Sequence, residues 1–302
     1  MKFMNFSRKN APTVTRLGCV FGDSFFDVTK AIGDDLLEFP RVVFSIEEVL
    51  QVKDGLSLLE DQLHNQKRSS SGLQSFLFQA EEIVFRAPLK HPQKVIGIGL
   101  NYKDHIEEFK KPAPKEPLLF AMYASAIIGP EESIVIPQMS QQVDYEAELA
   151  VVVGRRARNV SVESAVEYIA GYTICNDVSA RDLQFSDGQW LRAKSFDTFA
   201  PMGPYLVTRN ELGDGSGLGI ELRLNGKTMQ KSNTRNLIFD VPNLVSYISR
   251  VMTLEVGDVI ATGTPAGVGF VRNPPVFMKP GDVVEIEIER IGLLRNRVAE
   301  FD

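Results

Sequence analysis

Hydrophobic and polar positions alternate over much of this chain, and the pattern predicts more strands than helices. Val284, Ile286 and Ile288 alternate with three glutamates, which is typical of a strand with one buried face. The pair Asn225-Gly226 separates two short strand-like runs and predicts a β-hairpin. A continuous apolar run at Leu149 to Val153 predicts a strand buried on both faces. We therefore expect an α+β fold that is mainly β and is built on antiparallel sheets.

Four stretches with apolar residues three and four positions apart predict amphipathic helices. They are residues 46–50, 56–63, 162–169 and 242–251. Ser45 and Ser161 stand where N-caps are expected, and Gly171 is expected to end the third helix. Pro242 is expected to open the fourth helix, because proline suits the first helical turn.

The N-terminal part reads as a small domain of its own. Short apolar pieces separated by glycines over residues 1 to about 30 predict a β-meander, and the polar run at residues 67–72 predicts a flexible loop. Pro88 and Pro92 mark the expected boundary. We predict a small N-terminal α/β domain over residues 1–90 and a larger domain over residues 91–302.

Composition and charge exclude several classes of protein. The 302 residues carry a formal net charge of −6 with a pI near 5.3, which argues against a nucleic-acid partner. No apolar run approaches the length of a membrane span, so no membrane partner is expected. Cys19 and Cys175 lie in apolar surroundings and read as reduced core residues of a cytoplasmic protein.

The stretch from Val143 to Asp177 holds the strongest candidate chemistry. In an extended strand Asp144, Glu146 and Glu148 share one face, and the apolar run that follows leads this strand into the core. Buried carboxylates need compensation, and an all-oxygen set that includes Asp177 favours Mg²⁺ or Mn²⁺. The alternative is an acidic edge strand that faces solvent, and the Glu pair alone favours that alternative.

A possible base lies in the polar segment Lys103 to Pro117, which we expect to act as a lid. His105 and Glu108 are three residues apart, so in a helical turn the carboxylate can orient the imidazole as a base for water. The alternative is a surface helix pair. Lys194 lies between apolar residues and is a candidate to hold a substrate carboxylate or an enolate, or else a lysine at the edge of the core.

Other motifs support more than one interpretation. Arg181 and Gln184 follow Asp177 and could contact substrate, but their spacing favours a helix surface. The glycine-rich run at residues 262–269 can offer backbone N–H groups to a carboxylate or simply form a turn. The run V-I-G-I-G-L at residues 95–100 lacks the third glycine of a dinucleotide fingerprint, so we reject that reading.

Five motifs in this order resemble the fumarylacetoacetate hydrolase family: N-Y-x-D-H, D-Y-E-x-E-L, N-D-x-[ST]-A-R-D-x-Q, K-S-x-D and T-G-T-P-x-G-V-G. The resemblance covers about Val95 to Arg297 and implies a mixed β roll, usually in a homodimer. It implies Mg²⁺ or Mn²⁺ ligands at Glu146, Glu148 and Asp177. By the same resemblance the catalytic groups are His105, Glu108 and Lys194, and the substrate contacts include Tyr102, Arg181, Gln184 and Thr264. Met122 stands where the family often has a lysine.

The resemblance implies metal-dependent cleavage of a C–C bond in a small 2-oxo or β-diketo acid. The chain is similar to the short acylpyruvase and oxaloacetate decarboxylase branch. The metal is expected to stabilise the enolate that cleavage leaves. Two alternatives stay open: isomerisation of hydroxymuconate-type diacids, and a non-catalytic metabolite-binding protein of the same fold.

Overall fold

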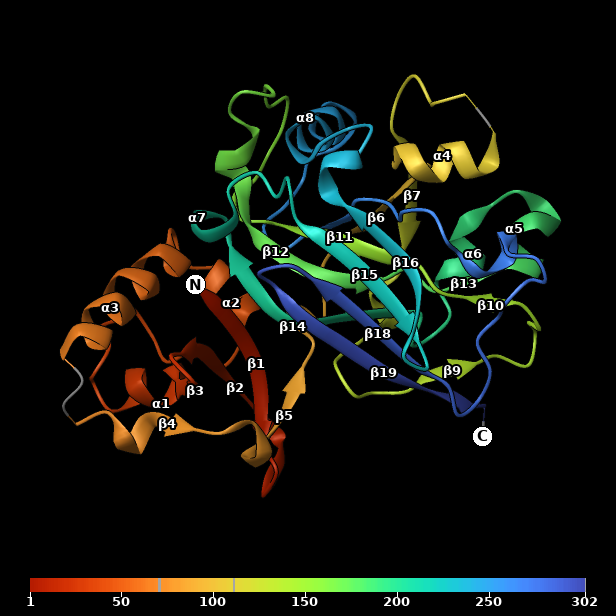
Figure 1. Ribbon diagram of the computed structural model, residues 1–302. Helices are drawn as coiled ribbons and strands as arrows, with labels where there is room; N and C mark the ends of the chain where they lie inside the picture. The colour runs from red at the N-terminus through yellow and green to blue at the C-terminus, as the bar shows by residue number, and fades with distance from the viewer. Residues whose placement is uncertain (70–71, 111, 302) are drawn as a thin grey trace.

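The computed structural model describes residues 1–69, 72–110 and 112–301, and sheets dominate it (Figure 1). Within these residues there are a 12-stranded, a five-stranded and a two-stranded sheet. Helices lie around the sheets as short pieces (Figure 1). The α+β, mainly β fold class is confirmed.

The large sheet crosses the whole molecule. Its main path runs β4 (Leu77–Phe78), β3 (Ser24–Asp27), β2 (Ala11–Phe21), β1 (Lys2–Arg8), β14 (Ala200–Thr208), β12 (Ile169–Asn176), β11 (Ala147–Val153), β17 (Val259–Ala261), β6 (Val95–Gly99) and β7 (Leu118–Met122). Off this path, β5 (Ile83–Arg86) pairs with β1 and β8 (Ile127–Ile128) pairs with β14.

Two smaller sheets complete the β structure. The five-stranded sheet has the order β16 (Lys227–Asn233), β15 (Gly219–Leu224), β18 (Val283–Ile288), β19 (Gly292–Glu300) and β9 (Ile134–Ile136). The two-stranded sheet joins β10 (Val143–Asp144) to β13 (Ser179–Ala180).

The helices are mostly of one to three turns. The α-helices are α1 (Val28–Gly33), α2 (Ile46–Leu50), α3 (Gly55–Ser69), α4 (Lys103–Phe109), α5 (Arg181–Asp187), α6 (Trp190–Lys194), α7 (Arg209–Leu212) and α8 (Val241–Val251). Single 3₁₀ turns are η1 (Gln74–Phe76), η2 (Ala80–Glu82), η3 (Ala124–Ala126), η4 (Ala165–Tyr168), η5 (Thr234–Asn236) and η6 (Gly269–Val271). None of the helices in the described ranges has the length and apolarity that a membrane crossing requires.

Most strand neighbours are antiparallel, as the short connections predict. Every residue of β11 is buried, and β11 pairs antiparallel with β12 on one side and β17 on the other. The Asn225-Gly226 hairpin is confirmed between β15 and β16, and both turn residues have a positive φ. Three pairs differ from the expectation because they are parallel: β17 with β6, β14 with β8, and β19 with β9.

Three of the four predicted helices are present, as α2, α3 and α8. The helix predicted over residues 162–169 is wrong, because the segment forms only the 3₁₀ turn η4 before Ile169 enters β12. The apolar spacing there serves the end of a loop and the start of a strand. The loop predicted at residues 67–72 begins later than expected, because α3 continues to Ser69; Ser70 and Ser71 lie outside the described residues.

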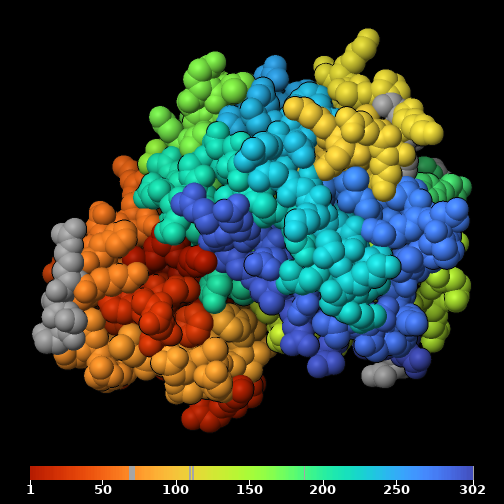
Figure 2. All heavy atoms as spheres, in the orientation of Figure 1, coloured from red at the N-terminus to blue at the C-terminus, as the bar shows by residue number. Residues whose placement is uncertain are grey.

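The N-terminal strands extend the large sheet. β1 pairs with β14 and with β2, which confirms the predicted meander of β1, β2 and β3. Figure 2 shows the residues at the red and orange end of the chain as a lobe on one side of the molecule. The division near residue 90 stays a prediction.

Candidate active site

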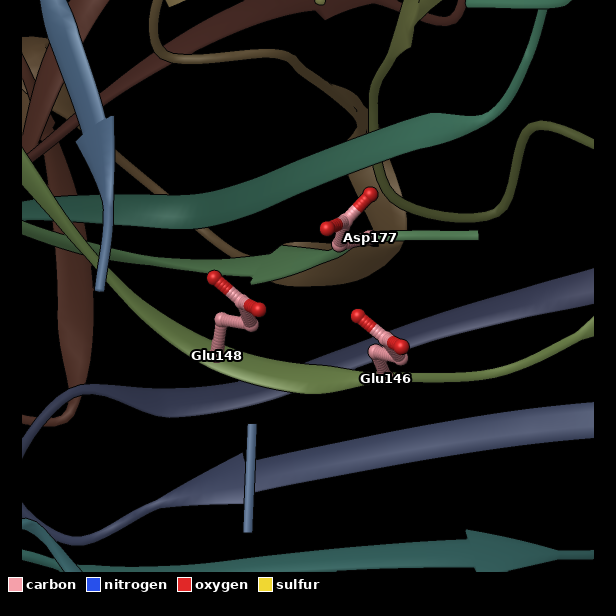
Figure 3. A group of neighbouring side chains, drawn as sticks. All are labelled: Glu146, Glu148 and Asp177. Carbon is pink, nitrogen blue, oxygen red and sulfur yellow. The ribbon is translucent and has the colours of Figure 1, made fainter. Parts of the chain in front are cut away.

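Three acidic side chains converge where β11 and β12 meet. Glu148 belongs to β11, Glu146 lies just before it, and Asp177 follows the last residue of β12. Their exposed fractions are only 7% for Glu146, 1% for Glu148 and 0% for Asp177. One ligand atom from each lies within 4.8 Å of the other two. Figure 3 shows the glutamates directed toward Asp177 across the gap between the strands.

A break in the predicted acidic strand separates this group from Asp144. The strand was expected to run on without interruption, but β10 ends at Asp144 and β11 begins at Ala147. The amide N–H of Glu146 donates to Asn176 Oδ1 at 3.0 Å instead of joining a ladder. Asp144 accepts from the amides of Gly269 and Phe270 and contacts Arg181, so it lies outside the group of three.

Backbone hydrogen bonds help to place the acidic residues. The amide of Asp177 donates to the carbonyl of Glu146 at 2.9 Å, which ties the two strand ends together. The amide of Gly263 donates to Glu148 Oε2 at 2.9 Å. The glycine-rich run at residues 262–269 therefore offers N–H groups to carboxylates, as one interpretation predicted. The carboxylate that accepts from Gly263 is a side chain of the protein itself.

Lys194 lies within the acidic group. Its Nζ donates to Glu146 Oε2 at 2.9 Å and to Asp177 Oδ2 at 2.5 Å. The side chain is buried, and the Phe120 ring lies 4.9 Å from its Nζ. The alternative of a lysine at the edge of the core is wrong, because the ammonium pairs with buried carboxylates.

Arg181 and Gln184 are buried, so the helix-surface interpretation of this pair is wrong. Arg181 contacts Asp144 Oδ2 through Nε at 2.9 Å and Glu146 Oε1 through Nη2 at 2.7 Å. It also donates through Nη1 to Gln184 Oε1 at 2.8 Å. The physical reason is charge compensation, because a guanidinium between two buried carboxylates offsets part of their desolvation cost.

The protonation of the acidic group follows from burial and neighbouring charge. Burial and the charge of Glu146 raise the pKa of Asp177 to about 7, although Lys194 acts against the shift. Burial, Asp177 and Glu146 together raise the pKa of Glu148 well above its ordinary value. Burial also acts to raise the pKa of Glu146, but Lys194 and Arg181 outweigh it and lower that pKa to about 2.

The donor set fits a hard divalent cation. All three side chains offer oxygen, the ligand type that Mg²⁺ and Mn²⁺ prefer. Asp177 Oδ1 is buried and has no hydrogen-bond partner among the described residues. When ionised, Asp144, Glu146, Glu148 and Asp177 carry four negative charges against the two positive charges of Lys194 and Arg181. One divalent ion would balance the remaining two.

His105 and Glu108 lie on α4, which confirms the helical turn expected for them. His105 Nδ1 is 3.4 Å from Glu108 Oε2, and the imidazole is 6% exposed. His105 and two of the acidic residues, Glu146 and Glu148, line the same cavity of about 100 Å³. The structure thus brings the predicted base and two of the three predicted metal ligands to one pocket.

An aromatic wall completes the pocket, and sequence reasoning missed it. Phe120 and Trp190 line the cavity with their ring centroids 5.3 Å apart. A Cβ on Gly97 would lie 2.1 Å from the Phe120 ring, and a Cβ on Gly99 would lie 2.3 Å from the Trp190 ring. The G-x-G signal that we rejected as a dinucleotide fingerprint therefore makes room for these rings. Phe185 and Phe270 line the pocket as well.

The remaining predicted substrate contacts differ in position. Thr264 and Gln184 line the cavity. The Thr264 hydroxyl already accepts from Gln230 and donates to the carbonyl of Ala147. Tyr102 is wholly buried and is absent from the residues that line the cavity. Substrate binding by these residues stays a prediction.

Sequence comparison identifies the family. Residues 94–299 match the model for the C-terminal region of fumarylacetoacetate hydrolases. The chain therefore belongs to this family of enzymes, as its motifs indicated.

Individual relatives and solved structures are similar to this chain. A protein of Archaeoglobus fulgidus is 59% identical over 211 residues, 70% of this chain and 80% of that protein. A mitochondrial oxaloacetate tautomerase of Bos taurus is 48% identical over 219 residues, 72% of this chain and 70% of that enzyme. Fumarylacetoacetate hydrolase from Exiguobacterium antarcticum matches with a TM-score of 0.82 and 34% identity over the full length of both chains. Maleylpyruvate hydrolase from Sphingobium, in complex with manganese and pyruvate, matches with a TM-score of 0.77 and 29% identity over the full length of both.

Proposed function

We propose that this protein is a divalent-metal-dependent enzyme that interconverts the enol and keto forms of oxaloacetate or a closely similar 2-oxo acid. The observation that carries the proposal is that Glu146 and Glu148, which form an acidic group with Asp177, line the same small cavity as His105. The name of the Bos taurus relative, an oxaloacetate tautomerase, supports the choice of reaction.

Each of these residues has a role that its chemistry suits. Glu146, Glu148 and Asp177 would hold Mg²⁺ or Mn²⁺, which supplies positive charge beside the oxygen of the enol. Maleylpyruvate hydrolase, which binds manganese and pyruvate, supports this choice of ion and of ligand class. Lys194 and Arg181 fix the position of Glu146 and limit the negative charge of the pocket.

His105 is the residue that would move the proton. Glu108 lies on the Nδ1 side of the ring, and we assign the proton transfer to Nε2, the other ring nitrogen. In the direction of ketonisation, protonated Nε2 would donate a proton to the carbon next to the carbonyl group, and the enol O–H proton would pass to water. The neutral imidazole would then regain a proton from solvent. In the reverse direction the neutral imidazole would remove the carbon proton.

Cleavage of a C–C bond is the second candidate. It is favoured by the likeness to maleylpyruvate hydrolase, and by a base that could equally activate water. Hydrolysis and decarboxylation both leave an enolate next to a carboxylate, so the same metal ligands would serve. The two candidates differ in whether a carbon fragment is released.

One assay separates these candidates. Protein treated with EDTA is mixed with the enol form of oxaloacetate, with or without added Mn²⁺, and the loss of enol absorbance and the appearance of pyruvate are followed together. We expect faster loss of the enol only with metal, and no pyruvate above the uncatalysed rate. Pyruvate released with the enol loss would favour cleavage. No acceleration with any metal would contradict both tautomerisation and decarboxylation of oxaloacetate.

The variant His105→Ala tests the role of the imidazole. We expect its rate of enol conversion to fall about 10²–10⁴-fold, which is typical for the loss of a general base. Mn²⁺ binding should persist, because the ligands lie on other elements. His91→Ala is a matched control, since His91 is exposed and lies outside the pocket. A normal rate in His105→Ala would mean that another group transfers the proton.

A further inference from the structure

Asp104 and Glu108 connect α4, the helix that carries His105, to β16 and to the glycine-rich run at residues 262–269. Asp104 Oδ2 accepts a hydrogen bond from Ser232 Oγ on β16 at 2.5 Å, and Asp104 Oδ1 accepts from the amide of Ala266 at 3.4 Å. One turn later, Glu108 accepts from the amide of Gly267 at 3.2 Å. Asn236 Nδ2 donates to Ser232 Oγ at 3.1 Å, so the hydroxyl has a fixed orientation. We call these contacts the α4 clasp.

Asp104 and the imidazole of His105 lie on different sides of the same helix. Neighbouring residues in an α-helix are rotated by about 100° about its axis, so Asp104 and His105 cannot face the same way. Asp104 faces β16 and the glycine-rich run, while His105 faces the cavity. A shift of α4 at Asp104 would therefore move the ring in the pocket, whereas the contacts of Glu146 with Arg181 and Lys194 come from the other helices α5 and α6.

The glycine-rich run is a rigid anchor for the clasp. The carbonyl of Gly267 accepts from Tyr145 Oη at 3.3 Å and from Arg272 Nε at 3.1 Å. Its φ is +103°, and a Cβ would lie 2.1 Å from the carbonyl oxygen of Met229, so glycine alone fits there. Tyr145 precedes Glu146 in the chain. Gly267 thus connects the segment of the acidic residues, through its carbonyl, to Glu108, through its amide.

We infer that Asp104 and Ser232 are positioning residues, which hold α4 so that His105 stands at a fixed place opposite the carboxylates. The inference rests on the proposed role of His105 as the base. Misplacement of a reacting group by about 1 Å can cost about 100-fold in rate. Loss of the clasp should therefore lower the turnover number while leaving the binding of metal and substrate intact.

The test compares Ser232→Ala with Ser232→Thr and with Glu107→Gln. Ser232→Ala removes the hydroxyl without changing any charge, and Ser232→Thr restores a hydroxyl. Glu107 lies on the same helix and is exposed, and its side chain makes no polar contact among the described residues, so Glu107→Gln is a matched surface control. We expect kcat for enol conversion to fall about 10- to 100-fold in Ser232→Ala only, with KM and Mn²⁺ affinity unchanged.

A second measurement keeps the inference separate from the proposed function. Amide hydrogen exchange of residues 103–109 needs no substrate, and it should speed up in Ser232→Ala and return toward wild type in Ser232→Thr. An inactive wild-type protein with this exchange pattern would contradict the proposed reaction but not the clasp. Unchanged exchange and unchanged kcat in Ser232→Ala would overturn the clasp, as would a fall in kcat that is matched by an equal loss of Mn²⁺ affinity.

Discussion

Lys194 shows how the neighbours of a residue decide its chemistry. By itself a lysine between apolar residues reads equally well as a core-edge side chain or as a ligand for an anion. Its contacts with Glu146 and Asp177 place its charge inside the acidic group. The same contacts mean that the group is partly neutralised before any metal binds. The residual charge on Glu148 and Asp177 then depends on protons.

Metal binding should release protons near pH 7. The pKa of Glu148 is raised well above its ordinary value and that of Asp177 to about 7, so without metal these carboxyls hold protons that a cation must displace. Calorimetric titration of Mn²⁺ into EDTA-treated protein in two buffers of different ionisation enthalpy measures this release. We expect roughly one proton per ion. Equal heats in both buffers would contradict the assignment.

The sequence predicted the acidic residues and the His105–Glu108 pair better than it predicted their surroundings. Strand alternation and the ends of apolar runs are local signals, so Glu146, Glu148 and Asp177 could be chosen before their convergence was known. The burial of Arg181 and Gln184 depends on tertiary packing. Their spacing along a helix says nothing about the carboxylates that approach from β10 and β11.

At the scale of the element, the two glycines of β6 have a packing role that the hydrophobic periodicity does not predict. The strand packs against the rings of Phe120 and Trp190, and the missing side chains at Gly97 and Gly99 leave the space that these rings fill. The aromatic wall of the pocket thus depends on the backbone of a neighbouring strand.

Replacing Gly99 should disturb this wall. In Gly99→Ala the new Cβ would lie 2.3 Å from the Trp190 ring, and overpacking of this kind costs about 1–3 kcal/mol in the free energy of unfolding. Urea denaturation measures the loss. Because Trp190 is the chain's one tryptophan, its fluorescence spectrum should also shift. Gly33→Ala, where an added Cβ has no neighbour within 4 Å, is the control. Wild-type stability and emission in Gly99→Ala would contradict the packing argument.

Two element predictions failed for one physical reason. The apolar spacing of residues 162–169 is compatible with a helix, and the acidic stretch before β11 is compatible with a continuous strand. In both places tertiary hydrogen bonds decided the outcome. Ile169 pairs with Val153 in the β11–β12 ladder, and the amide of Glu146 donates to the side chain of Asn176. Local patterns cannot anticipate partners that are far away in the sequence.

At the scale of the whole molecule, Asn5 joins parts of the chain that are distant in sequence. The side chain is buried on β1 and donates to the carbonyls of Ala87 and Pro88 at 3.1 and 3.0 Å. It also accepts from the amide of Ile46 at 2.9 Å, at the start of α2. The first two bonds fasten β1 to the segment that leads into β6, and the third joins β1 to α2 within the N-terminal lobe.

Asn5→Ala should lower the free energy of unfolding by about 2–4 kcal/mol. Three hydrogen bonds are worth about 1 kcal/mol each, and the buried amide of Ile46 would lose its partner. Chemical denaturation against Asn65→Ala, an exposed position on α3, measures the difference. Equal stability of the two variants would show that the lobe is held by its apolar contacts alone.

The fold class and the family could be predicted from the sequence, because the strand-rich pattern indicates the first and five ordered motifs indicate the second. The parallel pairs and the joining of β1 to β14 were not, since strand order is a global property. Cytoplasmic location and homodimer formation stay predictions, and the Bos taurus relative carries a mitochondrial name.

The most direct test of a metal-dependent enol chemistry is the location of the ion. Crystals grown with Mn²⁺ and oxalate, a mimic of the enolate of a 2-oxo acid, would be measured at the manganese absorption edge. We expect one anomalous peak among the carboxylates of Glu146, Glu148 and Asp177, with oxalate beside it and within reach of His105. A peak elsewhere, or no peak at a concentration of Mn²⁺ that supports activity, would contradict it.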